Sequence, residues 1–158
     1  MNSPIRRKPR LQNWVVGTFL GVAILFGLWP SKPTADPSLI QSGDYQLLAI
    51  NPDASVKLAV DVGDSEPGEL DIRWLGIVIE QPESTSVWLR RELAQVDQIT
   101  VRLDRRRLDE NGRPQAYFFL EDRLLNAELV GRDFAREDTH PSDFAPISRQ
   151  IRRAHSSE

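Results

Sequence analysis

The chain has 158 residues, enough for one domain of roughly 100–120 residues with its own core and an additional N-terminal segment. It contains no cysteine, which excludes disulfides and cysteine-based metal sites, and its two histidines, His140 and His155, lack the spacing of zinc ligands. The formal net charge of −3 is unevenly distributed, because residues 1–36 hold five basic residues and one acidic residue, whereas residues 37–158 hold 15 basic and 22 acidic residues, a net charge of −7.

The N-terminal residues show the pattern of a membrane anchor. Residues 1–13 are polar and include four basic side chains, and residues 14–29 follow without any charge. As a helix, this uncharged segment would span about 24 Å, close to the roughly 30 Å of a hydrocarbon core. The basic residues precede the segment, so we expect a single-pass cell-membrane protein with a cytoplasmic N-terminus and an extracytoplasmic C-terminal domain. A cleaved signal peptide is the alternative, which Pro33 disfavours because a small residue should stand there.

The remainder of the chain predicts a tether and one folded domain. Residues 30–43 contain three prolines and are expected to form a semi-rigid tether, and the domain is expected over residues 44–155. Five segments show the alternation or the short apolar length of strands, namely 45–50, 55–61, 70–74, 99–103 and 116–120.

Apolar residues with helical spacing predict one helix between the strands and two helices after them. Leu89, Leu93 and Val96 predict a helix that Ser84 or Thr85 would cap. Residues 125–130 predict a short helix that Gly131 would end in a left-handed conformation, and residues 144–154 predict another. Five strands interrupted by a helix fit a small OB-fold barrel, so we expect an α+β, mainly β domain with two to three helices.

A hairpin turn is predicted at Asn111-Gly112, just before Arg113. This dipeptide favours a type I′ turn, in which both central residues have positive φ. The apolar run 116–120 would form the strand that leaves the turn.

Two groups of residues follow one another after this turn begins, namely Gly112, Arg113, Ala116 and Tyr117, then Asn126, Leu129, Val130 and Ala135. Through these residues, segment 109–136 resembles the second half of a staphylococcal-nuclease-like (thermonuclease, or SNase-like) domain, although the family's glycine before that alanine is replaced. The resemblance extends over roughly residues 45–154. It implies a five-stranded OB-fold barrel and a nuclease, that is, a hydrolase that cleaves phosphodiester bonds of nucleic acid with Ca²⁺.

The resemblance also implies site residues. Arg73 and Arg113 match the arginines that would clamp the phosphate and stabilise the charge of the transition state. Glu83 matches the general base if two residues are inserted before Pro82, and Asp53 matches a calcium ligand.

Other observations favour a domain that has lost catalysis. The second metal-binding aspartate of the family falls on Val78, which cannot bind a cation, and Glu80 is the candidate substitute. The acidic charge of residues 37–158 also disfavours nucleic acid as a partner. The alternative function is therefore a degenerate barrel that acts as an envelope-bound binding or protein-interaction module, in which the candidate site residues form turns, helix ends and ion pairs.

Overall fold

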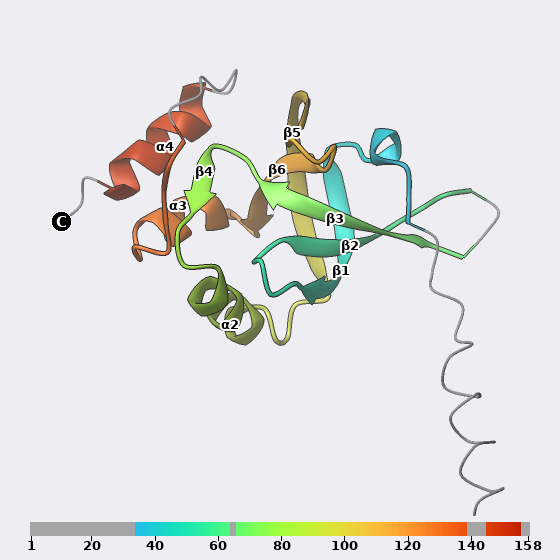
Figure 1. Cartoon of the computed structure of the whole chain (residues 1–158), viewed down its shortest axis with the longest axis horizontal. Helices are drawn as coiled ribbons and strands as arrows, with labels where there is room; N and C mark the ends of the chain where they lie inside the picture. The colour runs from blue at the N-terminus through green and yellow to red at the C-terminus, as the bar shows by residue number, and fades with distance from the viewer. Residues whose placement is uncertain (1–33, 64–65, 139–144, 156–158) are drawn as a thin grey trace, which may run out of the picture. The chain divides into compact units, whose positions relative to one another are not determined.

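The structure is a computed structural model that describes residues 34–63, 66–138 and 145–155 (Figure 1). The predicted membrane helix over residues 14–29 lies outside the described residues. Among the residues that are described, no helix is both long enough and apolar enough to cross a membrane.

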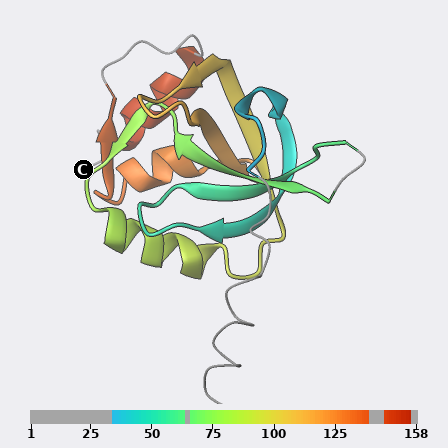
Figure 2. The same ribbon diagram turned by 45° about the vertical axis from the view of Figure 1, so that its right-hand side comes forward.

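Five strands close into a barrel (Figures 1 and 2). They are β1 (Gly43–Ile50), β2 (Val56–Val60), β3 (Gly68–Trp74), β5 (Gln98–Leu108) and β6 (Pro114–Leu120). Antiparallel pairing follows the order β3-β2-β1-β5-β6, and a parallel pairing of Arg73 with Gln115 and of Trp74 with Ala116 joins β6 back to β3. The prediction of a mainly β, five-stranded closed barrel is confirmed, and this architecture is compatible with an OB fold.

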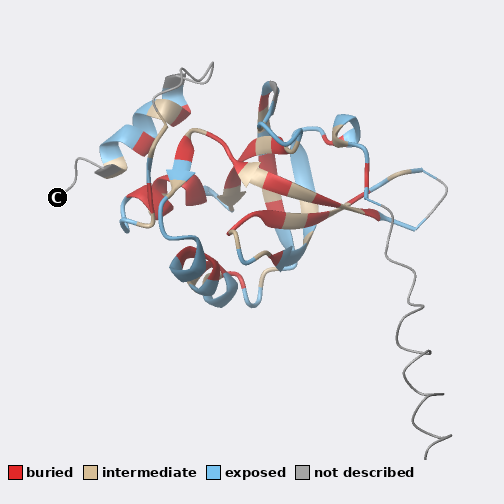
Figure 3. Ribbon diagram, in the orientation of Figure 1, coloured by how far each residue is buried: buried red, intermediate tan, exposed pale blue. Residues whose placement is uncertain are grey.

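Alternation along the strands decides which side chains fill the barrel. In β3, Leu70, Ile72 and Trp74 are buried, whereas Asp71 and Arg73 are partly exposed. Figure 3 shows buried and intermediate residues alternating along the barrel strands. The ring of Trp74 lies 4.6 Å from that of Phe118 on β6. Because side chains of a strand alternate between faces, the same strand supplies both the core and Arg73 of the candidate site.

Three helices and a small second sheet lie on one side of the barrel, whereas β2 and β3 extend from the other (Figures 1 and 2). The helices are α2 (Pro82–Glu92), α3 (Leu125–Val130) and α4 (Ala145–His155). Strand β4 (Ile77–Ile79) pairs with β8 (Ala135–Glu137), and the two-residue β7 (Arg123–Leu124) continues the barrel sheet beyond β6. Strands β4, β7 and β8 were not predicted, because runs of two or three residues are too short to show a period.

Two helix ends differ from the prediction. Helix α2 begins at Pro82 with Gln81 at the N-cap, not at Ser84 or Thr85, because proline at the first helical position has its φ already set for a helix. Gly131 ends α3 with φ −67°, so it is not left-handed. The left-handed residue is Asp133, with φ +58°, two positions later.

The hairpin between β5 and β6 forms as predicted, but its turn type is different. Of the two central residues, only Gly112 has positive φ, at +74°. The turn is closed by the N–H of Gly112, which donates to the carbonyl of Asp109 at 3.0 Å, and the N–H of Asp109 donates to the carbonyl of Arg113 at 2.8 Å. This pattern is typical of a type I turn followed by one left-handed residue, and the side chain of Asp109 stabilises it.

Residues 34–40 pack against the barrel. Thr34 pairs with Glu69 of β3, and the N–H of Ala35 donates to the carbonyl of Glu69 at 2.9 Å. Ala35 and Ile40 flank the short 3₁₀ helix η1 (Pro37–Leu39) and are 4% and 3% exposed. The described part of the predicted tether therefore contributes to the core.

Candidate functional site

The β1–β2 connection holds Asp53 in a fixed position. The N–H and Oγ of Ser55 donate to Oδ1 of Asp53 at 3.1 and 2.6 Å. Ala54 has φ +62°, an unfavourable conformation for a residue with a Cβ, and the indole Nε1 of Trp74 donates to its carbonyl at 2.6 Å. The buried Trp74 thus holds a strained turn whose tip carries the carboxylate.

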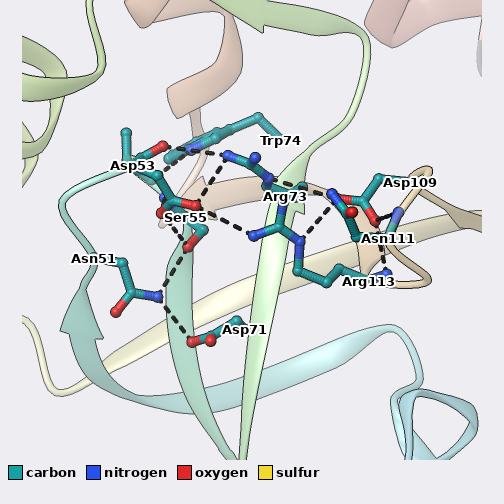
Figure 4. Close-up of polar contacts among 10 residues, drawn as sticks. Asn51, Asp53, Ser55, Asp71, Arg73, Trp74, Asp109, Asn111 and Arg113 are labelled. Carbon is teal, nitrogen blue, oxygen red and sulfur yellow. Dashed lines mark hydrogen bonds and ion pairs between the residues drawn. The ribbon is translucent and has the colours of Figure 1, made fainter.

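The two arginines implied by the resemblance come together on that carboxylate (Figure 4). Nη1 of Arg73, from β3, lies 3.3 Å from Oδ2 of Asp53, and Nη1 of Arg113, from the start of β6, lies 3.2 Å from the same atom. One carboxylate oxygen is therefore shared by guanidinium groups from two positions that are 40 residues apart in the chain.

Asp109 contacts the same two arginines on the side opposite to Asp53. Its Oδ2 lies 2.9 Å from Nε of Arg113 and 3.6 Å from Nε of Arg73. Its Oδ1 accepts hydrogen bonds from the backbone N–H of Asn111 at 2.9 Å and of Arg113 at 2.8 Å. We call Asp53, Arg73, Asp109 and Arg113 the Arg–Asp cluster.

Asp109 was not among the predicted site residues, although two features of the sequence point to it. An aspartate at the first position of a turn often accepts hydrogen bonds from the backbone two residues on. Two guanidinium groups that converge also need carboxylates to offset their mutual repulsion, and Asp109 is four residues before Arg113.

The surroundings of Asp53, Asp109 and Arg113 favour their ionised forms. Burial acts to raise the pKa of Asp53, but hydrogen bonds from Ser55, the charge of Arg73 and a hydrogen bond from Arg113 outweigh it, so this pKa is lowered. Burial also acts to raise the pKa of Asp109, but hydrogen bonds from Arg113 and Asn111 and the charge of Arg113 outweigh it, so this pKa is lowered as well. The pKa of Arg113 is raised against the effect of burial, chiefly by Asp109.

The hydrogen-bond network continues behind Asp53. Nδ2 of Asn51 donates to Oγ of Ser55 at 2.9 Å and to Oδ1 of Asp71 at 2.8 Å (Figure 4). Because Ser55 is 1% exposed, this chain of contacts links the carboxylate of Asp53 to the outer face of β3 through a buried hydroxyl.

The other predicted site residues lie elsewhere. Oε1 of Glu80 pairs with Nε of Arg136 at 3.2 Å, and both side chains are about half exposed. Glu83 is exposed in the first turn of α2, where it borders a surface depression with Val87 and Trp88. The structure therefore brings together Asp53, Arg73 and Arg113, whereas neither Glu80 nor Glu83 shares an ion pair with them.

This arrangement does not fit a calcium ion. Calcium takes six to eight oxygen ligands, several of them carboxylates, but both oxygens of Asp53 already accept from Ser55, Arg73 or Arg113. Val78, at the position of the second aspartate of the family, offers no oxygen from its side chain. Within residues 34–63, 66–138 and 145–155, no group of three or more histidine, cysteine, aspartate or glutamate side chains could hold a metal ion.

A pocket of about 370 Å³ adjoins the Arg–Asp cluster. It lies between the end of β3, the strand β4 and the β5–β6 hairpin. Its apolar wall is formed by Trp74 and by the three residues of β4, of which Val78 is 36% exposed. The pocket is large enough for a small ligand or for one or two side chains of a partner.

The sequence matches no family model and no curated protein.

Proposed function

We propose that this chain is a staphylococcal-nuclease-like barrel that acts as a binding module and has no calcium-dependent nuclease activity. The observation that carries the proposal is the ion pairing of Asp53 with both Arg73 and Arg113. In the nuclease these groups have separate tasks, since the carboxylate holds the metal and the guanidinium groups hold the phosphate. Here they neutralise each other, so neither partner is available without breaking the cluster.

Kinship with the nuclease family is supported by positions at which the resemblance and the geometry agree. Arg73 and Arg113 meet at one site, as a phosphate clamp would require. Asn126, which matches the family's asparagine, is buried and accepts from the N–H of Phe118 at 2.9 Å while it donates to the carbonyl of Leu75 at 2.9 Å. It thereby links α3 to β6 and to the connection between β3 and β4.

Loss of catalysis is supported by the remaining positions. The match to the general base, Glu83, lies on α2 outside the pocket beside the arginines. General-base catalysis needs a group within hydrogen-bond reach of the attacking water.

Residues 14–29 would hold the module at the outer face of a cytoplasmic membrane, where a binding domain acts on partners in the envelope.

A second candidate function is residual phosphodiesterase activity. It is favoured by the convergence of two guanidinium groups, the feature that stabilises charge on a transferring phosphoryl group. Such activity would require a ligand to separate Asp53 from the arginines.

A cleavage assay of the full chain distinguishes the two functions. The protein in non-ionic detergent is incubated with single-stranded DNA and calcium, with and without a chelator. We expect no chelator-sensitive cleavage. Cleavage that the chelator abolishes, and that Arg113→Ala or Glu83→Gln removes while Arg91→Ala on the exposed face of α2 preserves it, would contradict the proposal.

A further inference from the structure

Strand β4 is paired along one edge only, as far as the described residues go. Its partner is β8, in an antiparallel register (Figure 2). Just beyond the two ends of this pairing, the N–H of Asp138 donates to the carbonyl of Gly76 and the N–H of Glu80 donates to the carbonyl of Phe134, each at 3.0 Å. In an antiparallel pair, residues that exchange hydrogen bonds with the partner alternate with residues that do not. Residues 76, 78 and 80 therefore direct their backbone groups to β8.

The backbone groups of Ile77 and Ile79 point to the opposite edge of β4. Within the part of the chain that the structure describes, the N–H and C=O groups of these two residues make no hydrogen bond. We call these four groups the β4 edge. Ile77, Val78 and Ile79 all line the pocket of about 370 Å³ beside the Arg–Asp cluster, so the pocket lies along this edge.

The spacing of the β4 edge matches an extended peptide backbone. Two donors and two acceptors, carried by alternate residues of one strand, are the groups with which a further strand pairs, and peptides bind exposed sheet edges in this way. Ile77 is 6% exposed, and a backbone hydrogen bond that is shielded from water is stronger than one at an open surface. A strand added here would therefore gain directional contacts as well as area.

The side chains around the β4 edge indicate which residues an added strand would carry. Trp74 and the three residues of β4 form the apolar wall of the pocket, and Val78 is 36% exposed. Side chains that lie opposite each other on neighbouring strands stabilise a sheet most when they are β-branched or aromatic. The position opposite Val78 therefore favours a β-branched apolar residue.

We propose that the β4 edge binds an extended segment of a partner protein as an additional strand, which makes the small sheet three-stranded. Ile77 and Ile79 supply the backbone hydrogen bonds, and a β-branched residue of the partner packs against Val78. This inference rests on the proposed function, because it names the class of partner that the binding module takes.

Amide hydrogen exchange measured by NMR on the full chain in non-ionic detergent tests the inference at single residues. In the free protein, the amides of Ile77 and Ile79 are expected to exchange faster than that of Val78, which faces β8. The probe is a short peptide of alternating valine and serine. At millimolar peptide, exchange of Ile77 and Ile79 should slow about tenfold or more, whereas that of Val78 should change less than about twofold.

A modified peptide separates backbone pairing from side-chain contact. The comparison peptide has the same sequence, with N-methyl groups on four consecutive central residues, which removes donors from both of its edges. Fluorescence anisotropy of dye-labelled peptides gives Kd. We expect the N-methylated peptide to bind at least about tenfold more weakly, because several hydrogen bonds are lost.

Two variants of one residue make the same separation on the protein. Ile79→Pro removes an N–H that points to the pocket and leaves the pairing with β8 intact, since proline is tolerated where a strand's N–H faces away from its neighbour. It should raise Kd about fivefold, as the loss of one shielded hydrogen bond predicts. Ile79→Ala removes the side chain but keeps the N–H, and it should raise Kd less than about twofold.

Slow exchange of Ile77 and Ile79 in the free protein would overturn the inference, and a dependence of that exchange on protein concentration would assign the β4 edge to a second copy of the chain. It is also overturned if the peptide does not slow these amides, if the N-methylated peptide binds as tightly, or if Ile79→Ala weakens binding as much as Ile79→Pro. Near-UV circular dichroism checks folding, and the exchange pattern and the peptide pair still decide if Ile79→Pro is unfolded. These failures leave the proposed function standing, because only chelator-sensitive DNA cleavage contradicts that.

Discussion

Asp53 and Asp109 are both held in the ionised form by the groups around them. Their pKa values in the folded protein are lowered relative to about 3.9 for an unfolded chain. A lowered folded pKa contributes stability above about pH 4, and this contribution is lost as the pH falls through the folded pKa. The Arg–Asp cluster should therefore make the protein sensitive to acid rather than to base.

We predict a steep decrease in Tm below about pH 4 that depends on the cluster. Asp53→Asn with Asp109→Asn should lower Tm at pH 7 and flatten its dependence on pH between about 4 and 2.5, because the titrating groups are gone. Arg73→Gln with Arg113→Gln should flatten it only in part, because the hydrogen bonds from Ser55 and from the backbone of residues 111 and 113 also lower the two pKa values and remain. Thermal unfolding followed by circular dichroism over this pH range measures the Tm of both double variants. Unchanged acid sensitivity in either double variant would contradict the prediction.

The buried side chain of Asn126 links α3 to β6 and to the connection between β3 and β4. It is fully buried, and its amide serves the N–H of Phe118 and the carbonyl of Leu75. Asn126→Ala should lower the free energy of unfolding by about 2–4 kcal/mol, because two buried backbone groups lose their partner. Urea denaturation measures the change. Asn111→Ala, at an exposed position, should cost less than about 0.5 kcal/mol, and an equal loss in both variants would show that the buried hydrogen bonds are unimportant.

At the scale of elements, the turn from β3 to β4 determines where the pocket wall lies. Gly76 has φ +76°, and a Cβ at this position would lie 3.3 Å from Cε1 of Tyr117 and 3.4 Å from Cδ1 of Ile151. A side chain there would be both strained and crowded, so the close approach of β4 to β6 and α4 depends on glycine.

Gly76→Ala should therefore destabilise the protein by about 1–3 kcal/mol. Gly63→Ala isolates the contribution of the backbone, because Gly63 also has positive φ, at +95°, but no atom of the residues that the structure describes lies within 4 Å of an added Cβ. Gly43→Ala, with neither feature, should have little effect. Urea denaturation of the three variants should rank them in this order, and a Gly76 variant no less stable than the Gly63 variant would rule out the crowding.

The elements that the sequence predicted are those whose pattern is long enough to repeat. Alternation along 55–61 and 70–74 predicted β2 and β3 and the faces that they bury, and the same alternation turned Arg73 outward. Strands β4 and β8 have three residues each, and their pairing depends on chain segments almost 60 residues apart. Such short strands are stabilised by tertiary contacts, which no local pattern reveals.

The candidate site was predictable to a similar extent. Asp53, Arg73 and Arg113 were assigned through the resemblance, and the structure brings these three together. Their pairing with one another was not predicted, because the resemblance gives each residue a separate task. Glu83 was assigned by allowing an insertion before Pro82, and in the structure that insertion belongs to the connection between β4 and α2, which leads Glu83 away from the arginines.

At the scale of the whole molecule, the folded domain includes residues that precede the first strand of the barrel. Closure of the barrel leaves part of β3 available to segment 34–40, which pairs with Glu69 and adds Ala35 and Ile40 to the core. The described part of the predicted tether therefore belongs to the packed domain.

This packing predicts that the segment stabilises the domain. Ile40 is 3% exposed, so Ile40→Ala should lower the free energy of unfolding by about 2–4 kcal/mol through lost burial and the cavity left behind. The neighbouring Leu39 is 44% exposed and provides the matched control, since Leu39→Ala should cost less than about 1 kcal/mol. Urea denaturation of the full chain in non-ionic detergent, followed by circular dichroism, measures the change in both variants. If Ile40→Ala were as stable as Leu39→Ala, segment 34–40 would act only as a tether, and the domain would begin at β1.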